Sequence, residues 1–269
     1  GILMGSSFRA LVLIGIMVIL GTPGAAQVDL GRLQTLYQDM RSGDPATRFK
    51  AAGSIQADEQ FLKYPETPNR FLALLEVERR EIERLYASGE GYEGWGELYD
   101  SLLFSAWNLW KDKLTPEAFR VFAQASYSPG SRFARELGAR AGRFLKELIP
   151  LTTVDGEEVR MYTRENATAL VGYALAADQE GTAPLTPVNR AVLIQALTNA
   201  AASKDYGVRT AAVRGMKLAG GEWALPVLQK MYEREASFDP SGKNAYSVRQ
   251  FREEIGAAME TVRSRAAKR

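Results

Sequence analysis

Residues 203–216 read SKDYGVRTAAVRGM and repeat a pattern that residues 42–55 write as SGDPATRFKAAGSI, 161 positions earlier. Both copies contain, in register, a Ser, an Asp, an Arg and then small residues. The repeated charged residues are Asp44, Arg48, Asp205 and Arg209. An Asp at the end of a turn can accept hydrogen bonds from the first N–H groups of a helix, and small residues let helices approach closely. Each copy therefore predicts the start of a tightly packed helix.

The rest of the chain also has helical periodicity. In residues 28–42, apolar side chains recur at spacings of three and four, which is the pattern of one buried helix face. The same spacing recurs in five further stretches, residues 68–89, 94–113, 131–149, 189–203 and 222–236. Gly, Pro, Asp and Ser punctuate the segments between them, as expected of turns. These patterns predict an all-α protein.

One stretch leaves a β-hairpin open as an alternative. Residues 150–163 read PLTTVDGEEVRMYT, which places β-prone residues on both sides of Asp155 and Gly156. An Asp-Gly pair favours the tight turn of a two-residue hairpin loop. A short hairpin here is the only strand pairing that the sequence suggests.

The second copy resembles the HEAT-like helical repeats. The second helix of that repeat often opens with an Asp, then a Val-Arg pair, then Ala-rich packing positions, as in DYGVRTAAVRGMKLAGG at residues 205–221. The resemblance covers residues 28–56 and 187–235, and the separation of 161 residues equals four units of about 40 residues. It implies an α-solenoid of antiparallel helix pairs, irregular in its middle. The alternative is a chance recurrence in an Ala-rich helical protein.

If the resemblance holds, the shared residues Asp44, Arg48, Asp205 and Arg209 serve helix capping and stacking. We therefore assign none of them to catalysis. The expected partner of each Arg is a turn or an acidic residue of a neighbouring repeat.

The N-terminal segment has the features of a bacterial-type signal peptide. From Met4 onward it has one basic residue, Arg9, and an apolar run over residues 10–20 that is short for a membrane span. We expect a signal peptide at residues 1–26 and a helical repeat domain at residues 27–269, located in the periplasm or outside the cell. An uncleaved anchor is the alternative, and only this would bring the protein into contact with a membrane.

The composition excludes several chemistries. The chain has no His and no Cys, which removes Ser-His-Asp and Cys-His nucleophile systems and the usual zinc sites. The formal net charge is +2 and gives no long-range attraction to nucleic acid. We expect no cofactor, no metal and no nucleic-acid partner. Catalysis by two carboxylates, as in glycoside hydrolysis, stays open.

One aromatic and acidic segment is a candidate ligand groove. Carboxylates and aromatic rings alternate in residues 90–100, and two Trp residues follow at helical spacing. The candidate groove residues are Tyr92, Glu93, Trp95, Glu97, Tyr99, Trp107 and Trp110. Aromatic rings stack on sugars, so a glycan is the ligand that this pattern suggests. We favour the other interpretation, an acidic helix start whose aromatic side chains pack in the core.

Two functions follow from these patterns. The first is an exported, non-catalytic scaffold that binds a protein partner along stacked helices. The second is a carboxylate-dependent enzyme, or a binding protein, that acts on glycans. The sequence favours the first, and it identifies neither the partner nor the oligomeric state.

We predict that the exported protein begins at Gln27. Gly24 and Ala26 are small residues at the positions that a signal peptidase reads, and Pro23 ends the apolar helix before them. Mass spectrometry of the exported protein measures this terminus. A mature chain that retains residues 8–20 would instead identify an anchor.

Overall fold

The computed structural model describes residues 28–89, 95–154, 158–236 and 245–268. Within these residues the protein is all-α, with 77% helix, thirteen packed helices and no strand. The helices are α1 (Leu30–Asp39), α2 (Pro45–Gln56), α3 (Glu59–Leu62), α4 (Thr67–Ser88), α5 (Trp95–Trp110), α6 (Pro116–Gln124), α7 (Arg132–Ala141), α8 (Leu145–Leu151), α9 (Glu158–Gln179), α10 (Pro187–Ala201), α11 (Tyr206–Ala219), α12 (Ala224–Ala236) and α13 (Ala245–Ala266). The predicted all-α class is confirmed.

Short polar side chains fix several helix starts. Asp44, Thr115 and Thr186 each accept a hydrogen bond from a backbone N–H in the first turn of α2, α6 and α10, respectively. Each is followed by a Pro at the first or second helical position, where the missing N–H costs nothing. These caps fix where α2, α6 and α10 begin, whereas the periodic stretch at residues 131–149 divides into α7 and α8.

The hairpin that the sequence left open around Asp155 and Gly156 is not supported by the structure on either side of it. Residues 150 and 151 end α8, and α9 already begins at Glu158, so both flanks of the turn are helical. Leu151, at the end of α8, lies in the core between helices. Residues 155–157 themselves lie outside the described residues.

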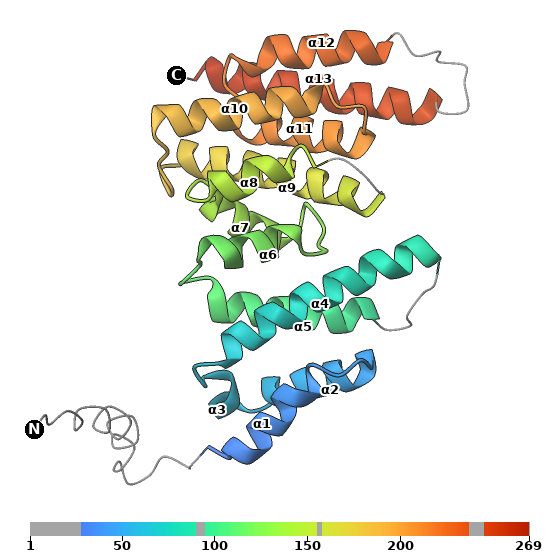
Figure 1. Cartoon of the computed structure of the whole chain (residues 1–269). Helices are drawn as coiled ribbons and strands as arrows, with labels where there is room; N and C mark the ends of the chain where they lie inside the picture. The colour runs from blue at the N-terminus through green and yellow to red at the C-terminus, as the bar shows by residue number, and fades with distance from the viewer. Residues whose placement is uncertain (1–27, 90–94, 155–157, 237–244, 269) are drawn as a thin grey trace, which may run out of the picture.

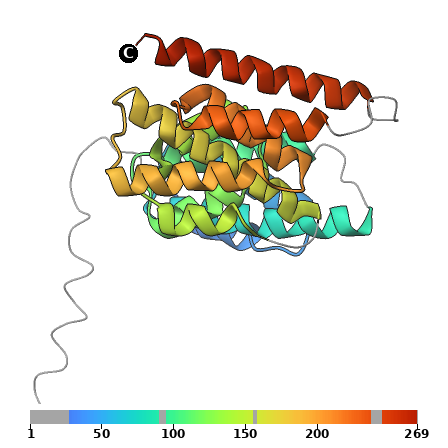
Figure 2. The ribbon, with the colours of Figure 1, turned by 90° about the horizontal axis from the view of Figure 1, so that it is seen from above.

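The helices are layered in the order of the chain (Figure 1). In one row α4, α6, α8, α10 and α12 contact one another in succession. In the other row α2 contacts α5, and α7, α9, α11 and α13 follow in succession. Hydrogen bonds between side chains link α1 to α4 and α5 to α7. Figure 2, which looks down on the last layer, shows α12 and α13 side by side with the earlier helices behind them.

A single cluster of buried hydrophobic residues runs through the layers, from Leu33 in α1 to Val262 in α13. The small helix faces expected from the repeated pattern belong to it. Its members there are Ala51, Ala52, Ile55, Ala212, Val213 and Met216. Consecutive layers therefore share one core.

Helices α9 and α11 cross at a pair of glycines. A Cβ added to Gly172 would lie 2.7 Å from the Cα of Gly215, closer than real Cβ atoms approach a backbone. Tyr173 beside it packs directly on Gly138 of α7. Helices α7, α9 and α11 therefore pack closely because glycines lie at their contacts.

We predict that Gly172→Ala destabilises the protein by about 1 to 3 kcal/mol, because the added methyl group meets the backbone of α11. Gly256→Ala in α13 is the matched control, since nothing lies within 4 Å of its added Cβ. The control should be neutral or stabilising by about 0.5 to 1 kcal/mol. Urea unfolding followed by circular dichroism measures both, and equal effects of the two substitutions would contradict the close crossing.

Candidate functional site

Three aromatic residues of the candidate ligand groove are buried between helices. Tyr99, Trp107 and Trp110 are 2%, 2% and 8% exposed, so all three belong to the core between helices. These three residues therefore do not form a ligand groove, and the favoured interpretation, that they pack in the core, is confirmed. Phe104, which has the helical spacing of the same stripe, is by contrast 62% exposed.

The surroundings of Trp107 explain its burial. Its ring makes edge-to-face contacts with Phe122 and Phe133 at centroid distances of 5.4 and 5.3 Å. Its indole N–H donates to Glu136 at 2.8 Å, and this bond, followed by one from Arg132, lowers the pKa of the Glu136 carboxyl. A buried indole with its one donor satisfied is a core residue.

The structure describes only part of the remaining groove candidates. Tyr92 and Glu93 lie outside the described residues, and so does the side chain of Trp95, where α5 begins. Glu97 is exposed on the first turn of α5. Burial raises the pKa of the Tyr99 phenol, whose oxygen accepts a hydrogen bond from the backbone N–H of Ser126 at 3.1 Å.

Arg48 makes a buried ion pair with a residue of the next helix pair. Its Nε donates to Oε1 of Glu78 in α4 at 2.5 Å, and the two side chains are only 6% and 0% exposed. One of its Nη groups also donates to the carbonyl of Ser42 at 3.0 Å. Arg48 thus ties the turn before α2 to α4.

Arg209 occupies the corresponding place in the second copy. One Nη group donates to the carbonyls of Ser203 at 3.1 Å and Lys204 at 2.8 Å. Its Nε lies 3.2 Å from Oε1 of Glu235 in α12, without hydrogen-bond alignment, and the side chains are 9% and 4% exposed. In both copies the Arg contacts the carbonyl of the shared Ser and a buried Glu of the following helix pair.

The two Asp residues differ. Asp44 caps α2 by accepting a hydrogen bond from the backbone N–H of Thr47 at 3.0 Å. Asp205 makes no such side-chain bond to α11, because its carboxylate pairs with Arg164 of α9 at 2.5 Å. The capping expectation therefore fits the first copy, whereas in the second copy the Asp links two neighbouring helices.

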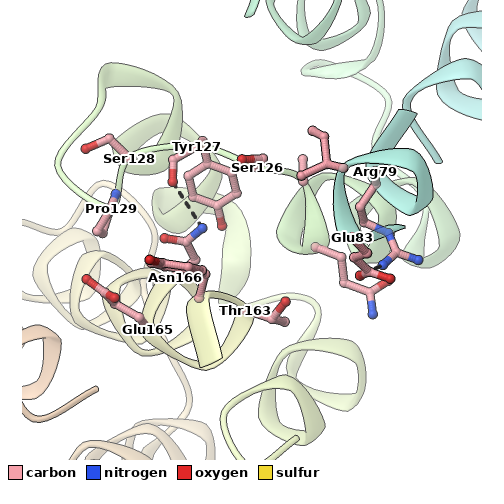
Figure 3. A pocket seen from close by; sticks show the side chains of 13 residues that line it. Arg79, Glu83, Ser126, Tyr127, Ser128, Pro129, Thr163, Glu165 and Asn166 are labelled. Atoms are coloured by element: carbon pink, nitrogen blue, oxygen red, sulfur yellow. Dashed lines mark hydrogen bonds and ion pairs between the residues drawn. The ribbon is translucent and has the colours of Figure 1, made fainter. Parts of the chain in front are cut away.

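A pocket of about 340 Å³ opens where three successive layers meet, and we call it the α9 pocket (Figure 3). It is lined by α4, by residues 124–129 at and after the end of α6, and by the first turns of α9. Figure 3 shows Arg79 and Glu83 at one end and Glu165 with Pro129 at the other. The pocket exists because the connection before α7 is extended rather than helical.

Side chains from neighbouring helices hold this connection. The amide nitrogen of Asn166 donates to the carbonyl of Tyr127 at 3.1 Å, as Figure 3 shows, and the hydroxyl of Tyr173 donates to the carbonyl of Pro129 at 3.0 Å. Burial raises the pKa of the Tyr127 phenol, whose hydroxyl donates to the carbonyl of Ala123. The pocket wall is thus anchored by partly buried hydrogen bonds.

The charged residues at the two ends of the α9 pocket, Arg79 and Glu165, differ in whether they are paired. Arg79 donates to Glu76 at 2.8 Å and also pairs with Glu83, so two carboxylates surround one guanidinium. Across residues 28–89, 95–154, 158–236 and 245–268, no hydrogen bond or ion pair holds the carboxylate of Glu165. Burial raises the pKa of the Glu165 carboxyl, and the charge of Arg214 offsets part of this rise.

A smaller hollow adjoins the α9 pocket and shares Glu165 and Pro129 with it; we call it the α11 hollow. Its remaining lining comes from Gly130, from α9 and from α11, and includes Arg214 and the exposed Leu218. Glu165 therefore stands between two depressions. Gly207 of α11 makes room for it, since a Cβ there would lie 2.5 Å from a carboxylate oxygen of Glu165.

The sequence did not single out the residues of the α9 pocket. Glu165 and Asn166 lie in an ordinary helical stretch, and Asn166 begins an Asn-Ala-Thr triplet whose Asn and Thr are buried. Arg79 and Glu83 belong to a long run of alternating charges on α4. The pocket depends on three segments far apart in the sequence, and no local pattern marks such a meeting.

Within the described part of the chain, no three or more Asp or Glu residues are grouped so that they could hold a metal ion. No helix of this part is both long and apolar enough to cross a membrane. Comparisons with models of known protein families, with curated proteins and with solved structures find no match.

We predict that Arg209→Ala destabilises the protein by about 3 kcal/mol or more, because it leaves Glu235 buried without its cationic partner. Arg214→Ala on the same helix is the control. Its side chain is 60% exposed and lies 4.0 Å from Glu254, so its loss should cost less than about 1 kcal/mol.

Chemical unfolding of both variants and of the double variant Arg209→Met with Glu235→Leu tests this prediction. Replacing both charges with apolar side chains should restore most of the lost stability. Equal midpoints for the two single variants would contradict a structural role for Arg209.

Proposed function

We propose that this protein is a non-catalytic scaffold built of HEAT-like helix pairs, exported from the cell, that binds a protein partner at the α9 pocket. The helix order supports the repeat architecture. Helix pairs α1–α2, α4–α5, α6–α7, α8–α9, α10–α11 and α12–α13 place the two copies of the sequence pattern four pairs apart. This agrees with the four units of about 40 residues expected from their spacing.

The observation that carries the proposal is the equivalent placement of Arg48 and Arg209. Each joins the turn inside its own helix pair to a buried Glu in the first helix of the next pair, Glu78 in α4 or Glu235 in α12. Helices that do not belong to a common repeat are not expected to share both the contact with a Ser carbonyl and the contact with a buried Glu. The equivalence supports a common repeat unit whose charged residues serve stacking.

The α9 pocket supports the binding role. It lies between layers and combines charged, aromatic and apolar side chains, among them the half-exposed Tyr162. Layered helical proteins bind partners along surfaces of this kind. Burial of Tyr99, Trp107 and Trp110 weighs against the glycan alternative, because these rings are not free to stack on sugars.

Photocrosslinking tests this function. We replace Tyr162 with p-benzoylphenylalanine in cells that naturally make the protein, and Val188, which is 72% exposed on α10, in a matched control. We expect a discrete protein adduct from position 162 and none from position 188. The absence of a protein adduct at position 162, or an adduct with glycan alone, would overturn the proposal.

A further inference from the structure

The unpaired carboxylate of Glu165 requires an explanation. The buried carboxylates of Glu78 and Glu235 both face a guanidinium. Glu165 is half-buried, its pKa is raised by that burial, and Arg214 is near enough to influence it without forming an ion pair. Burying a carboxylate without a partner is unfavourable, and a cation at this position would relieve the cost.

The surroundings of Glu165 indicate the shape of its ligand. Tyr162, Glu165, Ala169 and Tyr173 follow one face of α9 at spacings of three and four, and each lines the α9 pocket or the α11 hollow. The stripe is about 16 Å long at the rise of a helix, which matches about five residues of an extended chain. Tyr162 is exposed near one end of the stripe. Leu218 of α11, which lines the α11 hollow together with Tyr173, is exposed near the other end.

We propose that Glu165 binds the guanidinium group of an arginine in an extended segment of the partner protein, with that segment lying along α9 across both depressions. The inference rests on the proposed scaffold function. An arginine satisfies the charge of Glu165, and its planar guanidinium stacks on an aromatic face such as that of Tyr162. Arg79 does not compete, because Glu76 and Glu83 already surround it.

Peptides test this inference directly. Two pools of blocked, fluorescent octapeptides carry arginine or its neutral isostere citrulline at a fixed central position, with varied residues elsewhere. Fluorescence anisotropy with the purified protein should show the arginine pool binding about tenfold more tightly, as a charge-assisted hydrogen bond provides. Equal affinities for the two pools would overturn the inference.

Variants separate a binding role from a structural one. Glu165→Gln should abolish the preference for arginine, whereas Glu180→Gln, at an exposed position just after α9, should retain it. Gly207→Ala keeps every charge but displaces the Glu165 carboxylate, and should weaken the preference. A stable Glu165→Gln protein that still prefers arginine would overturn the inference.

The failure of this inference can be told from the failure of the scaffold function. A partner crosslinked at position 162, together with equal binding of the two peptide pools, would refute the arginine site alone. No partner adduct at position 162 would refute the scaffold function, whatever the peptides show.

Discussion

Buried charge is the constraint on which the stacking of this protein depends. Arg48 and Glu78 are almost fully removed from water, and so are Arg209 and Glu235. A buried ion pair adds little net stability compared with apolar residues, but losing one partner is costly, so the two must stay in contact. Because each pair joins a turn to the following helix pair, the requirement to match charges fixes how consecutive layers meet near both ends of the stack.

In the middle of the stack, contacts of other kinds join consecutive layers. Arg164 of α9 pairs with Asp205, which precedes α11, and the glycine crossing of α9 with α11 replaces bulky side-chain packing. Arg140 of α7 reaches back to the carbonyl of Lys111 after α5. Each contact still joins one layer to the next, but with different residues. This is why the repeated sequence pattern fades between its two copies although the layering continues.

The sequence predicted the all-α class because local features define helices, although α9 and α13 lie outside the periodic stretches. Asp44, Thr115 and Thr186 cap helices with bonds to residues a few positions away, so a short window contains all the information. The partners of Arg48 and Arg209 were not predictable, since Glu78 and Glu235 resemble any other Glu among 32 acidic residues. The aromatic segment left two interpretations open for the same reason. Helical spacing shows that Tyr99, Trp107 and Trp110 share a stripe, but only the packing of α6 and α7 shows that this stripe is covered.

The contrast between carboxylates is the strongest argument about function. A helical stack can place a Glu in its interior, as Glu78 and Glu235 show, but it then supplies a guanidinium at contact distance. Glu165 is held beside Gly207, which has no side chain to exclude it, and faces two depressions instead of a partner. An alanine at position 207 would be favoured by helix propensity, yet the glycine keeps room for the carboxylate. The half-buried charge of Glu165 has no partner within the described part of the chain, and the cationic ligand proposed above would satisfy it.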